Sequence, residues 1–344
     1  MSEPVALKLT AKDFKSDQEV RWCPGCGDYA ILAAVQQFMP ELNIPRENTV
    51  FVSGIGCSSR FPYYMNTYGM HSIHGRAPAI ATGLSVSRPD LSVWVVTGDG
   101  DALSIGGNHL IHALRRNVNL KILLFNNRIY GLTKGQYSPT SEVGKITKST
   151  PVGSADAPFN PLSLALGAEA TFVGRTIDSD RKHLQSVLRA AAEHQGSAFV
   201  EIYQNCNIFN DGAFEQLKEP GTRDDYLIRL EHGQPITFGK DGQFCVVHPP
   251  RGFGLEVRDT GATPAEEIVV HDATVADPAY AFALSRLPGF DLRNTPIGVF
   301  RSVRRPSYDS VVQEQLTEAR AKVTETPEQQ LAGLLSSGDT WTIS

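Results

Sequence analysis

The stretch LSVWVVTGDGD, residues 91–101, decides the fold class. Its apolar first part is typical of a strand buried on both faces, and the Gly/Asp run that follows ends the strand with a turn. Residues 121–127, KILLFNN, repeat this pattern of an apolar strand and a polar turn. Between them, residues 104–116 have apolar side chains at helical spacing. This order of strand, helix and strand predicts parallel strands joined by a helical crossover.

The same alternation continues in both directions along the chain. Helical spacing recurs in YAILAAVQQF (29–38), where Asp28 is a plausible N-cap, in APAIATGLS (77–85) and in RKHLQSVLRAAAEH (181–194). Further strands are predicted at TVFVSGIG (49–56) and SAFVEIYQNC (197–206). We therefore expect a doubly wound α/β fold with a mostly parallel sheet, whose ligands bind at the carboxyl ends of the strands.

The chain changes character after residue 206. Residues 207–230 form a polar stretch typical of loops, and residues 234–258 predict one or two β-hairpins with Gly and Pro turns. Residues 313–323 and 327–337 have the composition of helices. We therefore divide the chain into a domain over residues 1–230 and a C-terminal extension of unknown role over residues 231–344.

Composition limits the class of protein. The net charge of −5, with Lys and Arg scattered along the chain, does not indicate nucleic acid or an anionic membrane surface as a partner. No apolar run reaches the roughly 18–20 residues of a membrane-spanning helix. The polar, acidic N-terminus is unlike a signal peptide. We expect a cytoplasmic protein whose five cysteines are reduced.

Polar side chains follow the two strands with which we began. A magnesium ion bound to a diphosphate takes about six oxygen ligands. Asp99 can supply a charged oxygen, Asn127 a neutral one, and Ile129 its backbone carbonyl. Glycines around these residues would let the backbone approach the phosphates closely, and they are Gly98, Gly100 and Gly131.

Taken alone, Gly-Asp-Gly is also a common surface turn. Here, however, it ends one buried strand, an asparagine follows the next, and 26 residues lie between Gly100 and Asn127. This arrangement resembles the thiamine diphosphate motif. A Rossmann dinucleotide site is less compatible with the sequence, because no G-x-G-x-x-G opens a helix after the first strand.

Four cysteines are placed to meet at one edge of the predicted sheet. Cys23 and Cys26 form a C-x-x-C pair before a helix, Cys57 follows a strand, and Cys206 ends another. Four thiolates can hold an iron–sulfur cluster or a zinc ion, and the residues alone do not separate these alternatives. Cys245 lies in an apolar stretch and is expected to be a small buried hydrophobic residue.

At this point the chain resembles a known family, the β subunits of the 2-oxoacid:ferredoxin oxidoreductases. The matching segments follow the family order from residue 21 to about residue 206, and they are WCPGCGDY, GIGCSSR, HGRAPAIATG, TGDGDALSIGGNH, NNRIYGLTKGQ and QNC. GIGCSSR and YGLTKGQ are most similar to the members that use 2-oxoglutarate. The resemblance implies a thiamine diphosphate-binding fold in residues 1–230. It also implies coenzyme A-dependent oxidative decarboxylation of 2-oxoglutarate to succinyl-CoA and carbon dioxide, or the reverse reaction.

The resemblance also implies roles for individual residues. It places one [4Fe–4S] cluster on Cys23, Cys26, Cys57 and Cys206. The residues that it places around the thiamine cofactor are Ile55, Gly56, Cys57, Ser58, His74, Gly100, Asp101, Gly131 and Leu132. Arg60 and Lys134 lie within the motif loops, where a substrate carboxylate would need a cation.

The family pattern implies partners. No motif for the domain that activates thiamine occurs here, and the resemblance places that domain on a separate α subunit, in an αβ or α2β2 complex. Ferredoxin would accept the electrons. Three alternatives stay open: another 2-oxoacid such as pyruvate, a non-redox thiamine decarboxylase, and a zinc-stapled structural subunit.

Overall fold

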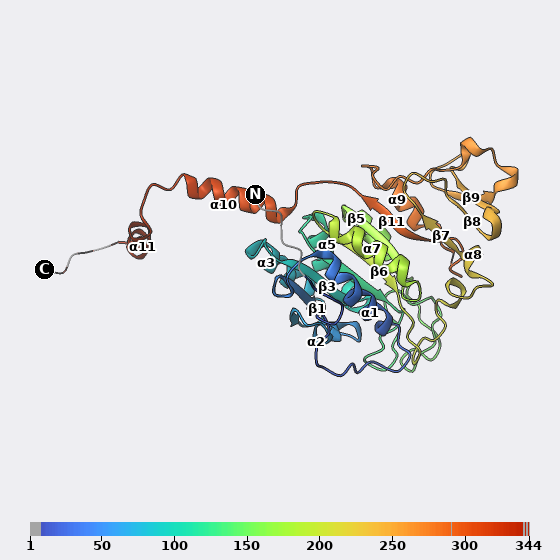
Figure 1. Ribbon diagram of the computed structural model, residues 1–344, viewed down its shortest axis with the longest axis horizontal. Coiled ribbons are helices and arrows are strands. Elements are labelled where there is room, and N and C mark those ends of the chain that lie inside the picture. Colours follow the sequence, from blue (N-terminus) through green and yellow to red (C-terminus); the bar gives the residue numbers. More distant parts are fainter. Residues whose placement is uncertain (1–7, 290, 340, 342, 344) are drawn as a thin grey trace.

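The computed structural model describes residues 8–289, 291–339, 341 and 343 (Figure 1). Its main sheet has eight strands in the order β2-β1-β3-β4-β6-β5-β11-β7. Neighbouring strands are parallel, except that β11 is antiparallel to β5. The strands are β1 Thr49–Ser53, β2 Tyr68–His71, β3 Ser92–Gly98, β4 Lys121–Asn126, β5 Phe172–Ile177, β6 Ala198–Tyr203, β7 Leu227–Leu230 and β11 Thr295–Ser302. The predicted α/β fold is confirmed.

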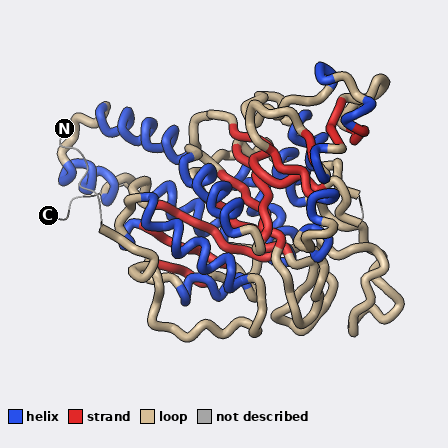
Figure 2. Tube along the Cα trace, turned by 45° about the vertical axis from the view of Figure 1, so that its right-hand side comes forward, coloured by secondary structure: helices blue, strands red, loops and turns tan. Residues whose placement is uncertain are grey.

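Helices pack on both faces of this sheet (Figure 2). Consecutive strand residues alternate between two apolar cores, so that Leu123 belongs to one core and Leu124 to the other. Helices α1 (Asp28–Phe38) and α7 (Arg181–Glu193) contribute to the Leu123 core. The Leu124 core is built with α3 (Ala77–Ser87), α5 (Gly107–Arg115), α6 (Pro161–Gly167) and α9 (Ala279–Ser285). The short helices are α2 (Phe61–Tyr64), α4 (Asp99–Leu103) and α8 (Arg223–Tyr226).

Two local details differ from the sequence prediction. Asp28 is not an N-cap: it is the first residue of α1, and the capping residue Gly27 makes no side-chain cap bond. The Gly/Asp run is not only a turn, because α4 begins at Asp99 itself. Asp28 and Asp99 are both buried, with exposed fractions of 1% and 3%. These carboxylates therefore need partners that the sequence pattern did not reveal.

The C-terminal extension contributes to two sheets. Its predicted hairpins form an antiparallel sheet of β8 (Thr237–Phe238), β9 (Phe244–Val247) and β10 (Glu256–Asp259). Strand β11 then enters the main sheet between β5 and β7, so the proposed boundary at residue 230 does not separate the sheets.

The two tail helices, α10 (Tyr308–Ala321) and α11 (Pro327–Leu335), extend away from the body (Figure 1). The first half of α10 is held to the body: the Asn119 backbone N–H donates to Asp309 Oδ1 at 2.9 Å, and Gln313 Nε2 donates to the Val86 carbonyl at 2.9 Å. None of the helices in the described part of the chain is long and apolar enough to cross a membrane.

Candidate active site

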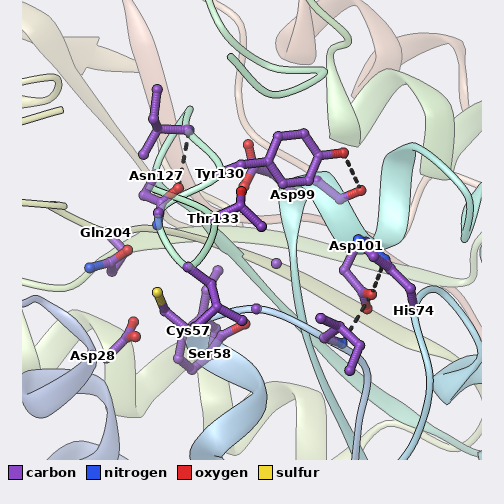
Figure 3. A pocket seen from close by; sticks show the side chains of 18 residues that line it. Asp28, Cys57, Ser58, His74, Asp99, Asp101, Asn127, Tyr130, Thr133 and Gln204 are labelled. Atoms are coloured by element: carbon purple, nitrogen blue, oxygen red, sulfur yellow. Dashed lines mark hydrogen bonds and ion pairs between the residues drawn. The ribbon is translucent and has the colours of Figure 1, made fainter. Parts of the chain in front are cut away.

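One pocket opens at the carboxyl ends of β1, β3 and β4 (Figure 3). It is lined by every residue that the sequence assigned to the magnesium ion or to the thiamine cofactor. These residues are Ile55, Gly56, Cys57, Ser58, His74, Gly98, Asp99, Gly100, Asp101, Asn127, Ile129, Gly131 and Leu132. The parallel topology brings these strand ends together, as expected, while the role of each residue stays a prediction.

Asp99 is a buried carboxylate held by two hydroxyl groups. Ser138 Oγ and Thr140 Oγ1 donate to its Oδ2, at 2.5 and 2.6 Å. Burial raises the pKa of Asp99 to about 6, although these hydrogen bonds lower it. Both hydroxyls approach the same oxygen, so they leave the other oxygen to a different partner. A buried carboxylate of this kind is costly without a cation, which fits a metal ligand.

A second contact joins the two loops that would hold a metal and diphosphate. Tyr130 Oη donates to the Gly100 carbonyl at 3.0 Å. A Cβ at position 100 would lie 2.1 Å from Tyr130 Cε1, so a glycine is required there. Within the second loop, the Ile129 backbone N–H donates to Asn127 Oδ1 at 3.1 Å. The loops after β3 and β4 are therefore fixed to each other before any ligand binds.

Asp101 connects three further elements of the pocket wall. Its Oδ1 accepts hydrogen bonds from the backbone N–H groups of Ile55 at 3.0 Å and Gly75 at 2.8 Å, and Thr97 Oγ1 donates to its Oδ2 at 2.7 Å. His74 Nδ1 lies 2.6 Å from Asp101 Oδ1 (Figure 3). This carboxylate thus holds the loops after β1 and β2 against β3 and fixes the His74 ring at the pocket wall.

The predicted cluster cysteines lie beside this pocket. A Cβ at Gly131 would lie 3.4 Å from Cys57 Sγ and 3.6 Å from Cys206 Sγ, so both thiols face the same loop. Gln204 Nε2 donates to Cys26 Sγ at 3.2 Å, and the Cys26 backbone N–H donates to the Cys23 carbonyl at 3.0 Å.

These four cysteines are free thiols, of which Cys206 is buried, Cys26 and Cys57 are partly buried, and Cys23 is exposed. Burial raises the pKa of Cys26, and it raises that of Cys57 to about 12. Within the described residues, no three His, Cys, Asp or Glu side chains are placed to hold a single metal ion. The thiolates of a four-iron cluster stand farther apart than the ligands of one ion. Cys245 is fully buried in β9 of the small sheet, as expected.

Sequence reasoning missed several residues of the pocket. Asp28 lines it, and burial raises the pKa of this carboxyl to about 7, which the neighbouring Cys26 thiol only partly offsets. Its position directly after CPGCG was the available signal. The other unpredicted lining residues are Phe125, Tyr130, Thr133 and Gln204.

The two candidate substrate cations lie at the edge of the motif loops. Arg60 ends the short 3-10 turn Ser58–Arg60 that follows Cys57, and Lys134 is exposed with a left-handed φ of 74°. Neither is among the described residues that line the pocket. Their proposed contact with a substrate carboxylate stays a prediction.

Comparison with known proteins agrees with this geometry. Residues 54–202 match the family of the thiamine pyrophosphate enzyme, C-terminal TPP binding domain. The chain is 66% identical to "2-oxoglutarate oxidoreductase subunit KorB" of Mycobacterium tuberculosis, over 96% of this chain and 88% of that protein. It is 39% identical to "2-oxoglutarate synthase subunit KorB" of Archaeoglobus fulgidus, over 63% of this chain and 82% of the relative.

A solved structure is similar over nearly the whole chain. It is described as "2-oxoglutarate:ferredoxin oxidoreductase from Magnetococcus marinus with 2-oxoglutarate, coenzyme A and succinyl-CoA bound". The TM-score is 0.75 and the identity 34%, over 95% of this chain and 96% of the matched chain. The likeness therefore includes the C-terminal extension.

Proposed function

The chain belongs to the β subunits of the 2-oxoglutarate:ferredoxin oxidoreductases, and from this premise we propose the reaction, cofactors and partners of its complex. With an α subunit it converts 2-oxoglutarate and coenzyme A to succinyl-CoA and carbon dioxide. The reaction releases one electron pair and a proton, and ferredoxin accepts the electrons. Reductive carboxylation is the same reaction in reverse. The observation that carries this proposal is the convergence of Asp99, Asn127 and Cys57 on one pocket.

The residues of the pocket fit thiamine diphosphate with magnesium. Asp99, the Asn127 amide and the Ile129 carbonyl would hold the ion, and Asp99 is the one charged ligand in this set. When bound, thiamine diphosphate supplies the electron sink for decarboxylation. The chain's own contribution is to fix the loops: Tyr130 joins the loops after β3 and β4, and Asp101 orients His74.

We place one [4Fe–4S] cluster on Cys23, Cys26, Cys57 and Cys206. Cys57 lies both among these cysteines and in the pocket wall, so a cluster here would be next to the cofactor. Replacing any of the four by Ser should lower the iron content of the complex, whereas Cys245→Ser is the matched control and should not. An essential Cys245 with a dispensable Cys206 would overturn the ligand set. Four reduced thiolates also favour a cytoplasmic location.

For the substrate, we propose that Arg60 or Lys134 contacts the second carboxylate of 2-oxoglutarate once the α subunit completes the pocket. Loss of such a charge-assisted contact costs roughly 1.5–3 kcal/mol, which is about 10- to 150-fold in kcat/KM. Arg60→Ala or Lys134→Met should therefore weaken the use of 2-oxoglutarate selectively. Equal losses with pyruvate would assign them to the carboxylate that both substrates share, or to coenzyme A.

The decisive experiment is anaerobic ferredoxin reduction by the α–β complex with coenzyme A and a panel of 2-oxoacids. We expect 2-oxoglutarate to give the highest kcat/KM. A higher value for pyruvate would replace the substrate and keep the family. Zinc without iron, or 2-oxoacid decarboxylation without electron transfer, would contradict the redox assignment. Gel filtration of the complex will distinguish αβ from α2β2.

A further inference from the structure

A line of buried polar side chains runs from the proposed cation site into the sheet. Thr140 Oγ1 lies 2.6 Å from Asp99 Oδ2 and 2.9 Å from Asn126 Oδ1, so its single proton can be donated to either of these two oxygens. Asn126 Nδ2 donates to Glu201 Oε1 at 2.7 Å. Arg175 Nε donates to the other oxygen of Glu201 at 2.6 Å. The line thus connects Asp99 with an ion pair in the middle of the sheet.

Strand register explains how this line forms. Arg175 of β5 and Glu201 of β6 are direct partners, and Glu201 is also the partner of Leu124 in β4. Asn126 is two residues beyond Leu124, so it lies on the same face as Glu201 and diagonal to it. At the far end, Arg175 Nη1 donates to the Pro296 carbonyl of β11 at 3.4 Å. The line therefore spans four neighbouring strands.

Stability alone does not account for the ion pair. Arg175 is 2% exposed and Glu201 is fully buried. Burying two charges costs most of what their attraction returns, and apolar residues of similar volume often give equal or higher stability. The pair thus adds little stability at this point of the sheet, and its role lies in the other residue that Glu201 contacts.

Asn126 is the residue that Glu201 serves. An ionised carboxylate only accepts hydrogen bonds, so it turns the amide nitrogen of Asn126 toward itself. The amide oxygen then faces Thr140 and accepts from the Arg128 backbone N–H at 3.1 Å. Asn126 therefore touches both halves of the cation site: the hydroxyl that holds Asp99, and the turn that carries Asn127 and Ile129.

We propose that Glu201, neutralised by Arg175, is a positioning residue for the cation site and acts through Asn126 and Thr140. The inference rests on the proposed function, because it concerns the site of the magnesium ion that accompanies thiamine diphosphate. Arg175 supplies the counter-charge to Glu201 inside the sheet, and Glu201 keeps Asn126 in one orientation. Residues behind metal ligands commonly change metal affinity by about 10- to 100-fold when replaced.

The test measures Mg²⁺ binding, by calorimetry on the α–β complex at a fixed thiamine diphosphate concentration. The variant Arg175→Met/Glu201→Leu removes the pair without leaving a buried charge. We expect its apparent Kd for Mg²⁺ to rise about tenfold, with a thermal midpoint without Mg²⁺ close to that of the parent. An unchanged Kd overturns the proposal, as does a lower midpoint with no change in Kd.

Glu201→Gln is the second variant, in case the double variant does not fold. Glutamine has one acceptor oxygen, so it cannot serve Asn126 and Arg175 together. We expect weaker Mg²⁺ binding here too, and parental affinity overturns the proposal. Thr171→Val is the matched control: its fully buried hydroxyl bonds Asn117 Oδ1 at 2.6 Å, just before β5 begins. It should leave Mg²⁺ affinity unchanged.

A double-mutant comparison tests the route. Thr140→Val removes the hydroxyl between Asn126 and Asp99. If Glu201 acts through Thr140, adding Arg175→Met/Glu201→Leu to Thr140→Val should weaken Mg²⁺ binding little further, whereas independent effects would multiply and contradict the route. Asp99→Ala separates the two proposals. If Asp99→Ala weakens Mg²⁺ binding and the Glu201 variants do not, only the role of Glu201 is contradicted. If Asp99→Ala itself leaves Mg²⁺ affinity unchanged, the magnesium assignment is contradicted as well.

Discussion

The middle of the sheet and the strand-end pocket treat buried carboxylates differently. In the middle of the sheet, Glu201 has the Arg175 guanidinium at 2.6 Å, so the chain supplies its own counter-charge. In the pocket, the partners of Asp99 are neutral, namely the hydroxyls of Ser138 and Thr140 and backbone N–H groups, and burial raises its pKa to about 6. The chain therefore supplies the counter-charge for Glu201, whereas the proposed magnesium ion would supply that for Asp99. Leaving Glu201 without Arg175 should therefore cost stability, whereas removing Asp99 should cost ligand affinity.

The largest effect should come from breaking the internal pair. Arg175→Met leaves the Glu201 carboxylate buried without a cation, which typically lowers the free energy of unfolding by about 3–5 kcal/mol. Chemical denaturation of the variant measures this loss. Arg175→Met/Glu201→Leu is the control, because it removes both charges and should recover most of the loss. If Arg175→Met were as stable as the parent, Glu201 would not depend on Arg175 for its counter-charge.

The next effect is a pH dependence of stability, and it comes from His194, which lies at the opposite end of the sheet from the pocket. His194 is 6% exposed, its Nε2 lies 2.8 Å from Thr171 Oγ1, and burial lowers its pKa from 6.5 to about 4. Between these two values the unfolded chain binds the proton and the folded chain does not, so stability falls as the pH drops from 6.5 toward 4. The expected loss for this group is about 2–3 kcal/mol.

Denaturant unfolding at pH 7 and at pH 4.5 measures this dependence. His194→Gln should lower stability at pH 7 but show a flatter pH dependence, because the buried titrating group is gone. An equally steep dependence in the variant would assign the acid sensitivity to other groups, such as His183, whose pKa burial also lowers to about 4.

Asp99→Ala should behave in the opposite way to Arg175→Met. It removes the one charged protein oxygen proposed for magnesium, so thiamine diphosphate affinity should fall at least tenfold, which is about 1.4 kcal/mol. Calorimetry measures that change. The free energy of unfolding without ligand should hardly fall, since the variant no longer buries an unpaired carboxylate. If Asp99→Ala lowered stability but not thiamine diphosphate affinity, Asp99 would behave like a residue of the sheet interior and not like a ligand-binding residue.

The sequence predicted the strand-end pocket well because its signals are local. Asp99 and Asn127 each follow an apolar strand directly, and parallel strands bring such ends to one edge. The loop after β1 reaches the same pocket for the same reason. The motif residues therefore needed no knowledge of strand register to be placed together.

The ion pair in the middle of the sheet was not predicted, because it depends on the register between neighbouring strands. Arg175 lies in FVGRTI, where a glycine and an arginine interrupt the apolar run, so β5 was missed. Glu201 lies inside a predicted strand, but its partner is fixed only by the pairing of β5 with β6. Thr140 comes from a long loop after β4. Contacts between residues so far apart in sequence leave no periodic pattern in either segment.

The smallest effect is expected for an ion pair that lies on the surface, which can be compared with the buried pair of Arg175 and Glu201. Arg189 of α7 donates through Nε to Glu41 Oε2 at 3.0 Å, and the two side chains are 45% and 44% exposed. Water and salt screen such a pair, and holding two long side chains in place offsets much of the attraction, so it contributes about 0.2–1 kcal/mol. Arg189→Gln should therefore lower the free energy of unfolding by no more than this, and less at high ionic strength. Denaturant unfolding at low and high salt measures both. A loss as large as that of Arg175→Met would mean that pairing itself, and not burial within the sheet, governs what these charges contribute.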